Sequence, residues 1–352
     1  MSDIALIIPS LDGKVEPLLA SVRHQTLPPA EVEVVRGVRP NGRARNLGVA
    51  RTTAPLLVFV DDDAVLGDEH VLANLTAPLR ADPTIGVTGA SKLLPPDASP
   101  FQRRVAREVP RIVHPVVERP LETNPDPPSF YCEITTTCCA MRREVFEQAG
   151  GFDETLRRGV DTEFFVRVRR LPVALRAPAR ENQHVRPRTE GQDQETEDGR
   201  RRTGGGGRPG STDHAGCSVQ HASSPGSPAL SACEGATQGR STHYRFVLVP
   251  HTWVYHPAPP TLGALLRKHF FYGYGHAQEV RRDPTRARGR ALHTPLHAAA
   301  FLLFRTAILL PNVFLPYSFA APSWRPGFKP LKALASYASA LGYLWGWYYA
   351  DR

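Results

Sequence analysis

Three short apolar runs near the start of the chain, separated by helix-like segments, restrict the possible fold more than any other feature of the sequence. They are residues 4–8 (IALII), 32–35 (VEVV) and 56–60 (LLVFV). After the first run, Leu18, Leu19 and Val22 recur at helical spacing, which predicts an amphipathic helix packed on a sheet. Because strands that alternate with helices form mainly parallel sheets, we expect an α/β fold.

A change of composition divides the chain, whose 352 residues suffice for one large core with an appended segment. From about 171 to 243 the sequence is rich in Gly, Ser, Pro, Gln and Arg and holds no Phe, Trp or Tyr, which predicts a disordered insertion. We therefore expect one domain from 1–170 and 244–280, interrupted by 171–243. A basic and apolar helical region at 281–352 should follow it.

Three consecutive aspartates, Asp61, Asp62 and Asp63, come directly after the run at 56–60. Open α/β sheets bind their ligands at the carboxyl ends of parallel strands. Carboxylates this close repel one another, and Mg²⁺ or Mn²⁺ would relieve the repulsion and also bridge to phosphate oxygens. Taken alone, the triplet is equally compatible with a solvated acidic turn or a helix N-cap.

The net charge of +9 favours anionic partners such as phosphates, nucleotides or acidic lipid headgroups. Charge alone would also admit nucleic acid, which we do not expect as a partner. The five cysteines lack zinc-type spacing, so a reducing compartment is the simplest interpretation. The N-terminal MSDIALIIPSLDGK has no basic n-region or cleavage site, and it predicts a strand and not a signal peptide. We therefore expect the protein on the cytoplasmic side.

Residues 42–64, GRARNLGVARTTAPLLVFVDDDA, resemble the family-2 glycosyltransferase pattern, in which an ARN.G..A helix precedes a strand ending in a DxD-type motif. Residues 135–170, with an RR.VF..aGGFDE unit and an ED-like motif, are similar to the acceptor-side block of that family. The opening strand and the segment with the first helix and second strand are also similar to this family. Together, four segments match the family pattern in the same order over roughly residues 4–170. The resemblance implies a GT-A fold: a Rossmann-like, mixed and mainly parallel sheet flanked by helices.

On this resemblance, Asp61 and Asp63 are the two carboxylates of the DxD motif, Asp61 near the donor ribose and Asp63 on the metal. Asp62 fills the variable position and belongs with the donor contacts. Asp161 corresponds to the second acid of the ED motif, which is the general base toward the acceptor hydroxyl in inverting members. From the residues alone, an aspartate at a helix entrance is also a plain N-cap.

Further donor contacts are implied at Pro9 and Ser10, at the end of the opening strand, and at Arg45 and Asn46 in the ARN helix. The chain departs from the family at two places. The second strand usually ends in an aspartate that holds the base, but here Arg36 stands there, and it could meet phosphate instead. The first acid of the ED motif is replaced by Val160.

The family-like pattern returns at Tyr244 with a strand, YRFVLVPHTWVYH, and a short helix near 261–271. His256 stands where many sugar transferases of this fold bring a histidine to the metal or diphosphate, and the nearby His251 competes for that role. The segment 268–277, KHFFYGYGHA, resembles a loop and helix that close over the active site in relatives. Its aromatic residues also fit a core or a membrane interface.

The run at 296–319 has the length of a bilayer-spanning helix, but Arg305, Pro311 and Pro316 interrupt it. An interfacial or re-entrant hairpin fits better, because the basic cluster at 281–290 and the terminal Tyr and Trp residues suit a membrane surface. We expect the protein at the cytoplasmic face of the cell membrane. A buried helical subdomain is the alternative.

The sequence as a whole predicts an inverting, Mg²⁺- or Mn²⁺-dependent glycosyltransferase. Its donor would be a nucleotide diphosphate sugar, and its acceptor a glycan or lipid-linked molecule of the cell envelope. No QxxRW motif follows, which speaks against the processive branch such as cellulose or chitin synthases. Two alternatives stay open. A sugar nucleotidyltransferase should carry a glycine-rich basic loop after its first strand, and PSLDGK matches it poorly. A catalytically degenerate membrane-associated binding protein would fit the insertion and the missing second-strand aspartate.

Overall fold

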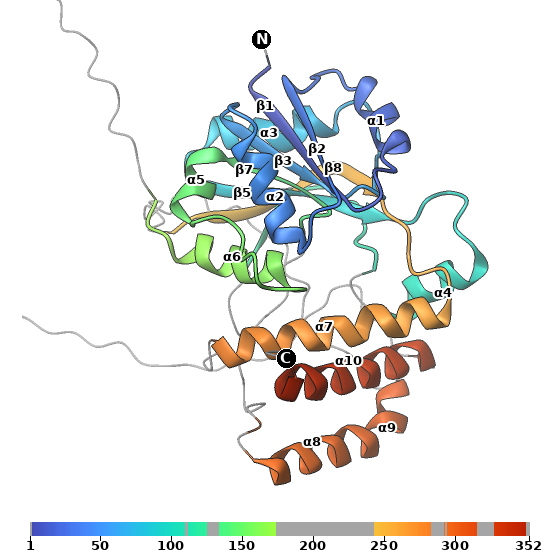
Figure 1. Cartoon of the computed structure of the whole chain (residues 1–352). Helices are drawn as coiled ribbons and strands as arrows, with labels where there is room; N and C mark the ends of the chain where they lie inside the picture. Colours follow the sequence, from blue (N-terminus) through green and yellow to red (C-terminus); the bar gives the residue numbers. More distant parts are fainter. Residues whose placement is uncertain are drawn as a thin grey trace, which may run out of the picture. The chain divides into compact units, whose positions relative to one another are not determined.

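The computed structural model describes residues 2–109, 112–124, 134–173, 243–282, 292, 294–314 and 327–349 (Figure 1). Its strands are β1 (Ile4–Ser10), β2 (Glu31–Arg36), β3 (Leu56–Val60), β4 (Val65–Leu66), β5 (Ile85–Leu93), β6 (Leu121–Thr123), β7 (Cys138–Arg142) and β8 (Arg245–Tyr255). They form one mixed sheet in the order β2-β1-β3-β7-β5-β8-β4, with β6 paired to β8. Strands β1, β2, β3, β5 and β8 run in one direction and the others run against them, so the predicted mixed, mainly parallel sheet is confirmed.

The helices are α1 (Glu16–Arg23), α2 (Asn41–Ala50), α3 (Val71–Ala81), α4 (Pro100–Glu108), α5 (Arg143–Gln148), α6 (Val160–Arg170), α7 (Leu262–Arg282), α8 (Pro295–Ala307), α9 (Leu309–Phe314) and α10 (Pro330–Tyr349). Helices α1 and α3 cover one face of the sheet, and α2, α5 and α6 cover the other, as their shared buried clusters show. The central strands are therefore apolar on both faces, as expected of a sheet covered twice.

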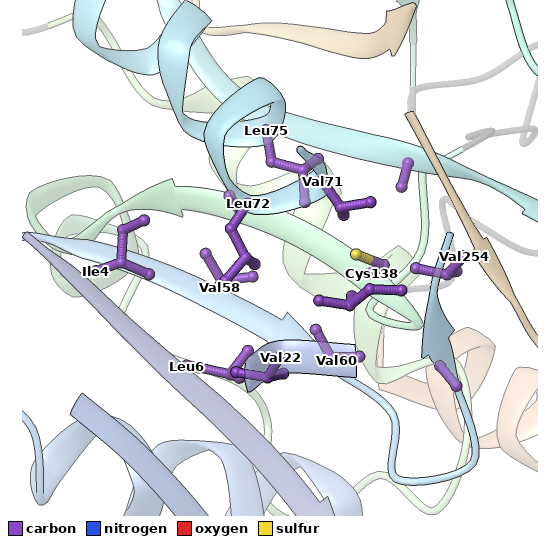
Figure 2. Close-up of a cluster of buried hydrophobic side chains, with 14 of the residues drawn as sticks. Ile4, Leu6, Val22, Val58, Val60, Val71, Leu72, Leu75, Cys138 and Val254 are labelled. Carbon is purple, nitrogen blue, oxygen red and sulfur yellow. The ribbon is translucent and has the colours of Figure 1, made fainter. Parts of the chain in front are cut away.

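The first face is built from alternate residues of the central strands. Ile4 and Leu6 of β1 and Val58 of β3 point into it, and Figure 2 shows Leu72 and Leu75 of α3 above them. All five side chains are fully buried. Each contributes roughly 1.5–3 kcal/mol of burial, so this face holds the sheet and α3 together.

A cluster of phenylalanines fills the second face. Phe59 of β3 meets Phe152 edge to face at 5.4 Å, and Phe152 lies 4.4 Å from the ring of Phe164 in α6. Phe146 of α5 touches all three rings. The cluster therefore fixes the loop around Phe152 and the start of α6 beneath the carboxyl end of β3.

The chain leaves and re-enters the sheet domain at one point. Pro172 and His243 form an isolated antiparallel bridge, while the predicted insertion, apart from its first and last few residues, lies outside the described residues. Because both ends are already adjacent, removing residues 174–242 needs no rearrangement of the sheet. We expect a variant with a short Gly-Ser linker in their place to keep its melting temperature and cooperative unfolding in calorimetry. Loss of cooperative melting would show that the segment is part of the folded core.

The short helix expected near 261–271 is longer than predicted, because α7 continues without a break to Arg282. The segment 268–277 is thus helical and does not form a separate loop. A Cβ on Gly273 would lie 1.8 Å from the Ser339 carbonyl of α10, and one on Gly342 would lie 1.8 Å from the Phe270 carbonyl. Gly273 and Gly342 therefore allow the backbones of α7 and α10 to pack in close contact.

The C-terminal apolar region forms α8, α9 and α10; α10 packs on α7, and α8 and α9 pack on each other and on α10 (Figure 1). Arg305 lies within α8 and Pro311 within α9, whereas Pro316 and most of the basic cluster at 281–290 lie outside the described residues. Within the described ranges, every helix falls short of the length and apolar character that a bilayer crossing requires.

Candidate metal centre

The aspartate triplet lies where β3 ends. The Asp61 amide donates to the Thr137 carbonyl at 3.1 Å, which extends the pairing of β3 with β7 by one residue. The chain then turns at once into β4, whose two residues pair with the last two residues of β8. Because His256 directly follows β8, this pairing carries its imidazole back to the triplet.

Asp61, Asp63 and His256 form a three-residue cluster in the part of the chain that the structure describes. One ligand atom from each lies within 4.8 Å of the others, and the His256 Nε2 is 3.4 Å from a carboxylate oxygen of Asp63. Two carboxylates and an imidazole are suitable ligands for Mn²⁺ and, with water, for Mg²⁺. The predicted metal ligands are thus brought together, although the assignment of a cation to them remains a prediction.

The protonation behaviour of this cluster fits cation binding. Burial lowers the pKa of His256 to about 4, so the imidazole is neutral at pH 7, as a metal ligand must be. Loss of hydration raises the pKa of Asp63 to about 6, and the neighbouring Asp61 and Asp62 carboxylates add to the shift. The ionised triplet therefore has an excess of negative charge that a bound cation would offset.

Arg45 holds the other side of Asp61. Its side chain is only 4% exposed, and its guanidinium donates to the Asp61 Oδ1 at 2.7 Å. The Arg45 guanidinium also lies 5.8 Å from the centre of the Phe152 ring, while its Nε has no hydrogen-bond partner. The buried Arg45 therefore holds a fixed positive charge against Asp61, and its hydrogen bond orients the Asp61 carboxylate. Its Nε remains an unused donor.

Asn46, the next residue of the ARN helix, was predicted to contact the donor, but its side chain bonds to other residues of the protein. Its side-chain amide donates to the Phe152 carbonyl and to Glu154, and its oxygen accepts from the Phe152 amide. These bonds tie α2 to the GGFDE loop. Asn46 thereby holds this loop against α2, and a contact with the donor remains a prediction.

An open groove runs along the carboxyl ends of β1 and β2. It has a volume of about 530 Å³ and is lined by Leu11, Gly37, Val38, Arg39, Arg43 and Leu47. Pro9 and Ser10 end β1 at this edge, and the Ser10 hydroxyl accepts from the Gly13 amide. Arg36 ends β2, is exposed, and packs along Gly13. The predicted donor contacts Pro9, Ser10 and Arg36 therefore adjoin the groove without lining it.

Asp161 lies in the first turn of α6 and outside the three-residue cluster. Its carboxylate accepts from the Thr162 amide at 2.9 Å. Burial raises the pKa of the Cys139 thiol, the adjacent Cys138 adds to the shift, Arg45 opposes it, and the charges of Asp161 and Asp61 raise it further. Both carboxylates are thus near enough to the start of β7 for their charges to act on the same thiol.

Gly159 shapes the entrance of α6. Its φ is +75°, and a Cβ there would lie 1.9 Å from an oxygen of the buried Glu279 of α7. We expect Gly159→Ala to lower the melting temperature, by roughly 1–3 kcal/mol of stability, and to displace Asp161. Gly263→Ala is the matched control, because a Cβ at Gly263 meets nothing within 4 Å, and it should be neutral or slightly stabilising. Equal melting of the two variants would contradict this role.

Two further basic residues, one near the cluster and one in the groove, were not predicted from the sequence. Lys268 of α7 is close enough for its charge to lower the pKa of both His256 and Asp63, although burial dominates both shifts. Arg39 lines the groove beside Arg43. The basic stretch RGVRPNGRARN gave a signal for Arg39, whereas nothing local marks Lys268. His251 is exposed, lies 3.7 Å from Glu118 and does not belong to the cluster.

No family model and no curated protein matches this chain. Among solved structures, it is similar to the Pyrobaculum calidifontis mannosyltransferase PcManGT in complex with GDP-Man and Mn²⁺, with 15% identity and a TM-score of 0.47 over 97% of this chain and 87% of that one. S. aureus TarS aligns with 16% identity and a TM-score of 0.35, over 47% of this chain and 33% of TarS. TarS residues 1–349 with UDP-GlcNAc align with a TM-score of 0.33, over 47% and 53% of the two chains. At these values the similarity does not extend to individual residues.

Proposed function

We propose that this chain is an inverting, metal-dependent glycosyltransferase of the family-2 type. The observation that carries the proposal is the convergence of Asp61, Asp63 and His256 at the carboxyl edge of the sheet. Two carboxylates and a neutral imidazole would hold Mg²⁺ or Mn²⁺. When bound, the cation would neutralise the charge that develops on a departing diphosphate.

The donor would be a nucleotide diphosphate sugar. Arg39 and Arg43 in the groove beside β1 and β2 offer hydrogen-bond donors and positive charge to a nucleotide. The exposed Arg36 at the end of β2 and Lys268, whose charge acts on Asp63 and His256, would add further positive charge. Pro9, Ser10, Asp61 and Asp62 would line the path between the nucleotide and the sugar.

Asp161 would act as the general base toward the acceptor. As its carboxylate takes the proton of the acceptor hydroxyl, that oxygen bonds to the anomeric carbon and the bond from this carbon to the diphosphate oxygen breaks. A single displacement of this kind inverts the anomeric configuration. Gly159 and the phenylalanine cluster would keep Asp161 in place, because both fix the first turn of α6.

The acceptor is proposed to be a glycan or lipid-linked molecule of the cell envelope, glycosylated at the cytoplasmic face of the membrane. Its basis is the C-terminal region, in which apolar and aromatic side chains are exposed on α8, α9 and α10. A sugar transferred at a membrane surface needs an acceptor that is held there.

A screen of nucleotide sugars tests the proposed activity. The purified full chain would be incubated with UDP-, GDP-, CDP- and dTDP-sugars, with Mn²⁺, with Mg²⁺ or with EDTA, and nucleoside diphosphate release would be measured. We expect slow release from one donor class, and only with metal. Absence of release from every donor would favour the degenerate binding protein, whereas formation of a nucleotide sugar from a nucleoside triphosphate would favour the nucleotidyltransferase.

Metal binding should depend on pH, because protons compete with the cation for Asp63. Its pKa is raised to about 6, so in the metal-free protein its contribution to stability falls as the pH rises from about 4 to about 6. A cation reverses this cost once the carboxylate is ionised. We expect Mn²⁺ to raise the melting temperature at about pH 8 and to have little effect at about pH 5. A pH-independent effect of Mn²⁺ would contradict binding at Asp63.

A further inference from the structure

Helix α8 and helix α9 carry an exposed apolar face. Its side chains are Leu296, Leu303, Phe304, Leu310 and Phe314, which are 76%, 73%, 60%, 77% and 61% exposed. Leu296 and Leu303 of α8 are seven residues apart, and Leu310 and Phe314 of α9 are four apart, spacings that each return to the same side of a helix. Each helix therefore has an exposed apolar side, and the exposed residues are not scattered singly.

Arg305, the charged residue of α8, points toward α10. The Arg305 guanidinium donates to the Ser336 carbonyl at 2.8 Å and to its hydroxyl at 2.6 Å, and the Thr306 hydroxyl lies 3.1 Å from that of Tyr337. Both partners belong to α10. A surface helix in water turns its arginine outward and its leucines inward. Helix α8 does the reverse, which indicates an apolar environment on its outer side.

Aromatic residues of interfacial type are exposed at the end of α10. Trp345 and Tyr349 stack with ring centres 4.6 Å apart, and they are 53% and 45% exposed, with Tyr348 at 44%. Trp and Tyr are enriched at the boundary between lipid headgroups and acyl chains, because their rings are apolar while the N–H or O–H remains hydrated. This pattern favours a lipid surface over a dry protein interface.

The charge of the C-terminal region indicates which kind of partner surface it would bind. Residues 284–350 contain no Asp or Glu, while the basic residues there are Arg286, Arg288, Arg290, Arg305, Arg325, Lys329 and Lys332. A region with only positive charges is attracted to anionic lipid headgroups. In a symmetric dimer through this face, two copies of the same basic region would meet and repel each other. The charge thus favours a membrane over a second copy.

We propose that the apolar face of α8 and α9 docks flat on the surface of a bilayer that contains anionic lipid. The leucine and phenylalanine side chains enter the boundary between headgroups and acyl chains. Trp345 and Tyr349 lie at the headgroup level, and the net positive charge of residues 284–350 draws the surface toward the lipid phosphates. This binding needs neither donor nor metal, so its failure and the failure of the proposed sugar transfer are separate results.

Vesicle flotation tests the proposal on the full chain without detergent. The vesicles are pure phosphatidylcholine or phosphatidylcholine mixed with phosphatidylglycerol. We expect the protein to float with the mixed vesicles, weakly with the neutral ones, and less at high salt. The double variant L303E/L310E should bind about 100-fold more weakly, at roughly tenfold for each leucine. Its melting temperature should not fall, because both side chains are exposed.

The matched control is V32E/L121E, which introduces the same charges at two apolar residues of β2 and β6 that are 44% and 37% exposed. It should float like the wild type. If L303E/L310E does not melt cooperatively, L296E replaces it. The proposal is overturned if the wild type binds neither vesicle or binds both equally, or if the glutamate variant binds like the wild type. It is also overturned if the wild type does not bind vesicles but forms a dimer in sedimentation equilibrium, and the glutamate variant is a monomer.

Discussion

Replacing Asp63 with asparagine is expected to abolish metal-dependent sugar transfer and leave the fold intact. The variant keeps the shape of the side chain but removes the ionised oxygen that lies 3.4 Å from the His256 Nε2. Losing one charged ligand removes several kcal/mol of stabilisation from the departing diphosphate, which corresponds to a turnover lower by at least about 10³-fold. Initial rates with the donor found by the screen measure the effect.

The stability of this variant distinguishes a functional role of Asp63 from a structural one. Loss of hydration and the adjacent carboxylates raise the pKa of Asp63, whose side chain is still 54% exposed, so its ionised form opposes folding of the metal-free protein only weakly at neutral pH. Asp63→Asn should therefore melt at or above the wild-type temperature without metal. Asp62→Asn is the comparison, because Asp62 lies outside the three-residue cluster and its loss should reduce turnover far less. Similar rates for the two variants would contradict the ligand assignment.

Replacing Asp161 with asparagine is expected to stop transfer to the acceptor without weakening the binding of donor or metal. The amide keeps the acceptor oxygen that the Thr162 amide bonds, but it cannot take a proton. General base catalysis contributes about 10²–10⁴-fold, so kcat should fall by that amount. Donor affinity, measured by calorimetry with Mn²⁺, should match the wild type, because Asp161 is outside the metal cluster.

Glu163→Gln is the control for charge at the start of α6. Glu163 shares the first helical turn with Asp161, but it pairs with Arg167 at 2.6 Å. Its loss removes the same formal charge and should cost a little stability while leaving kcat close to that of the wild type. If Glu163→Gln lost turnover and Asp161→Asn retained it, the general base would have to be sought elsewhere.

The parts of the fold that sequence could predict are those whose signal is local. β1 and β3 are apolar on both faces, which marks them as central strands. The triplet follows β3 directly, so its place at the carboxyl ends of the parallel strands could be predicted from the order of the elements alone. The ED-like helix was also predicted, and α6 begins at Val160, with Asp161 in its first turn.

The completion of the cluster was not readable from local sequence. His256 reaches Asp63 only because the two residues of β4 pair with the end of β8, about 190 positions further along the chain. Resemblance to known sugar transferases suggested this histidine, but no periodicity did. Lys268 approaches for a similar reason, since its position depends on how α7 packs.

The length of α7 and the bonds of Asn46 show where tertiary contacts override local signals. Glycine lowers helix propensity by about 1 kcal/mol, so the glycines of 268–277 favoured a loop. Against α10, however, Gly273 allows a backbone contact that any side chain would block. Asn46 matched a motif, but the structure directs its side chain to Phe152 and Glu154. A motif locates a residue in the chain, whereas its hydrogen bonds depend on the neighbours that folding supplies.

A titration with Mn²⁺, followed by electron paramagnetic resonance, tests the central claim most directly. It would compare the wild type with Asp63→Asn, each with and without the nucleoside diphosphate of the donor. The wild type should bind one Mn²⁺ per chain, more tightly when the diphosphate is present, and Asp63→Asn should lose this site. Absence of a Mn²⁺ site in the wild type, or an unchanged site in the variant, would contradict the assignment of Asp61, Asp63 and His256 as the metal centre.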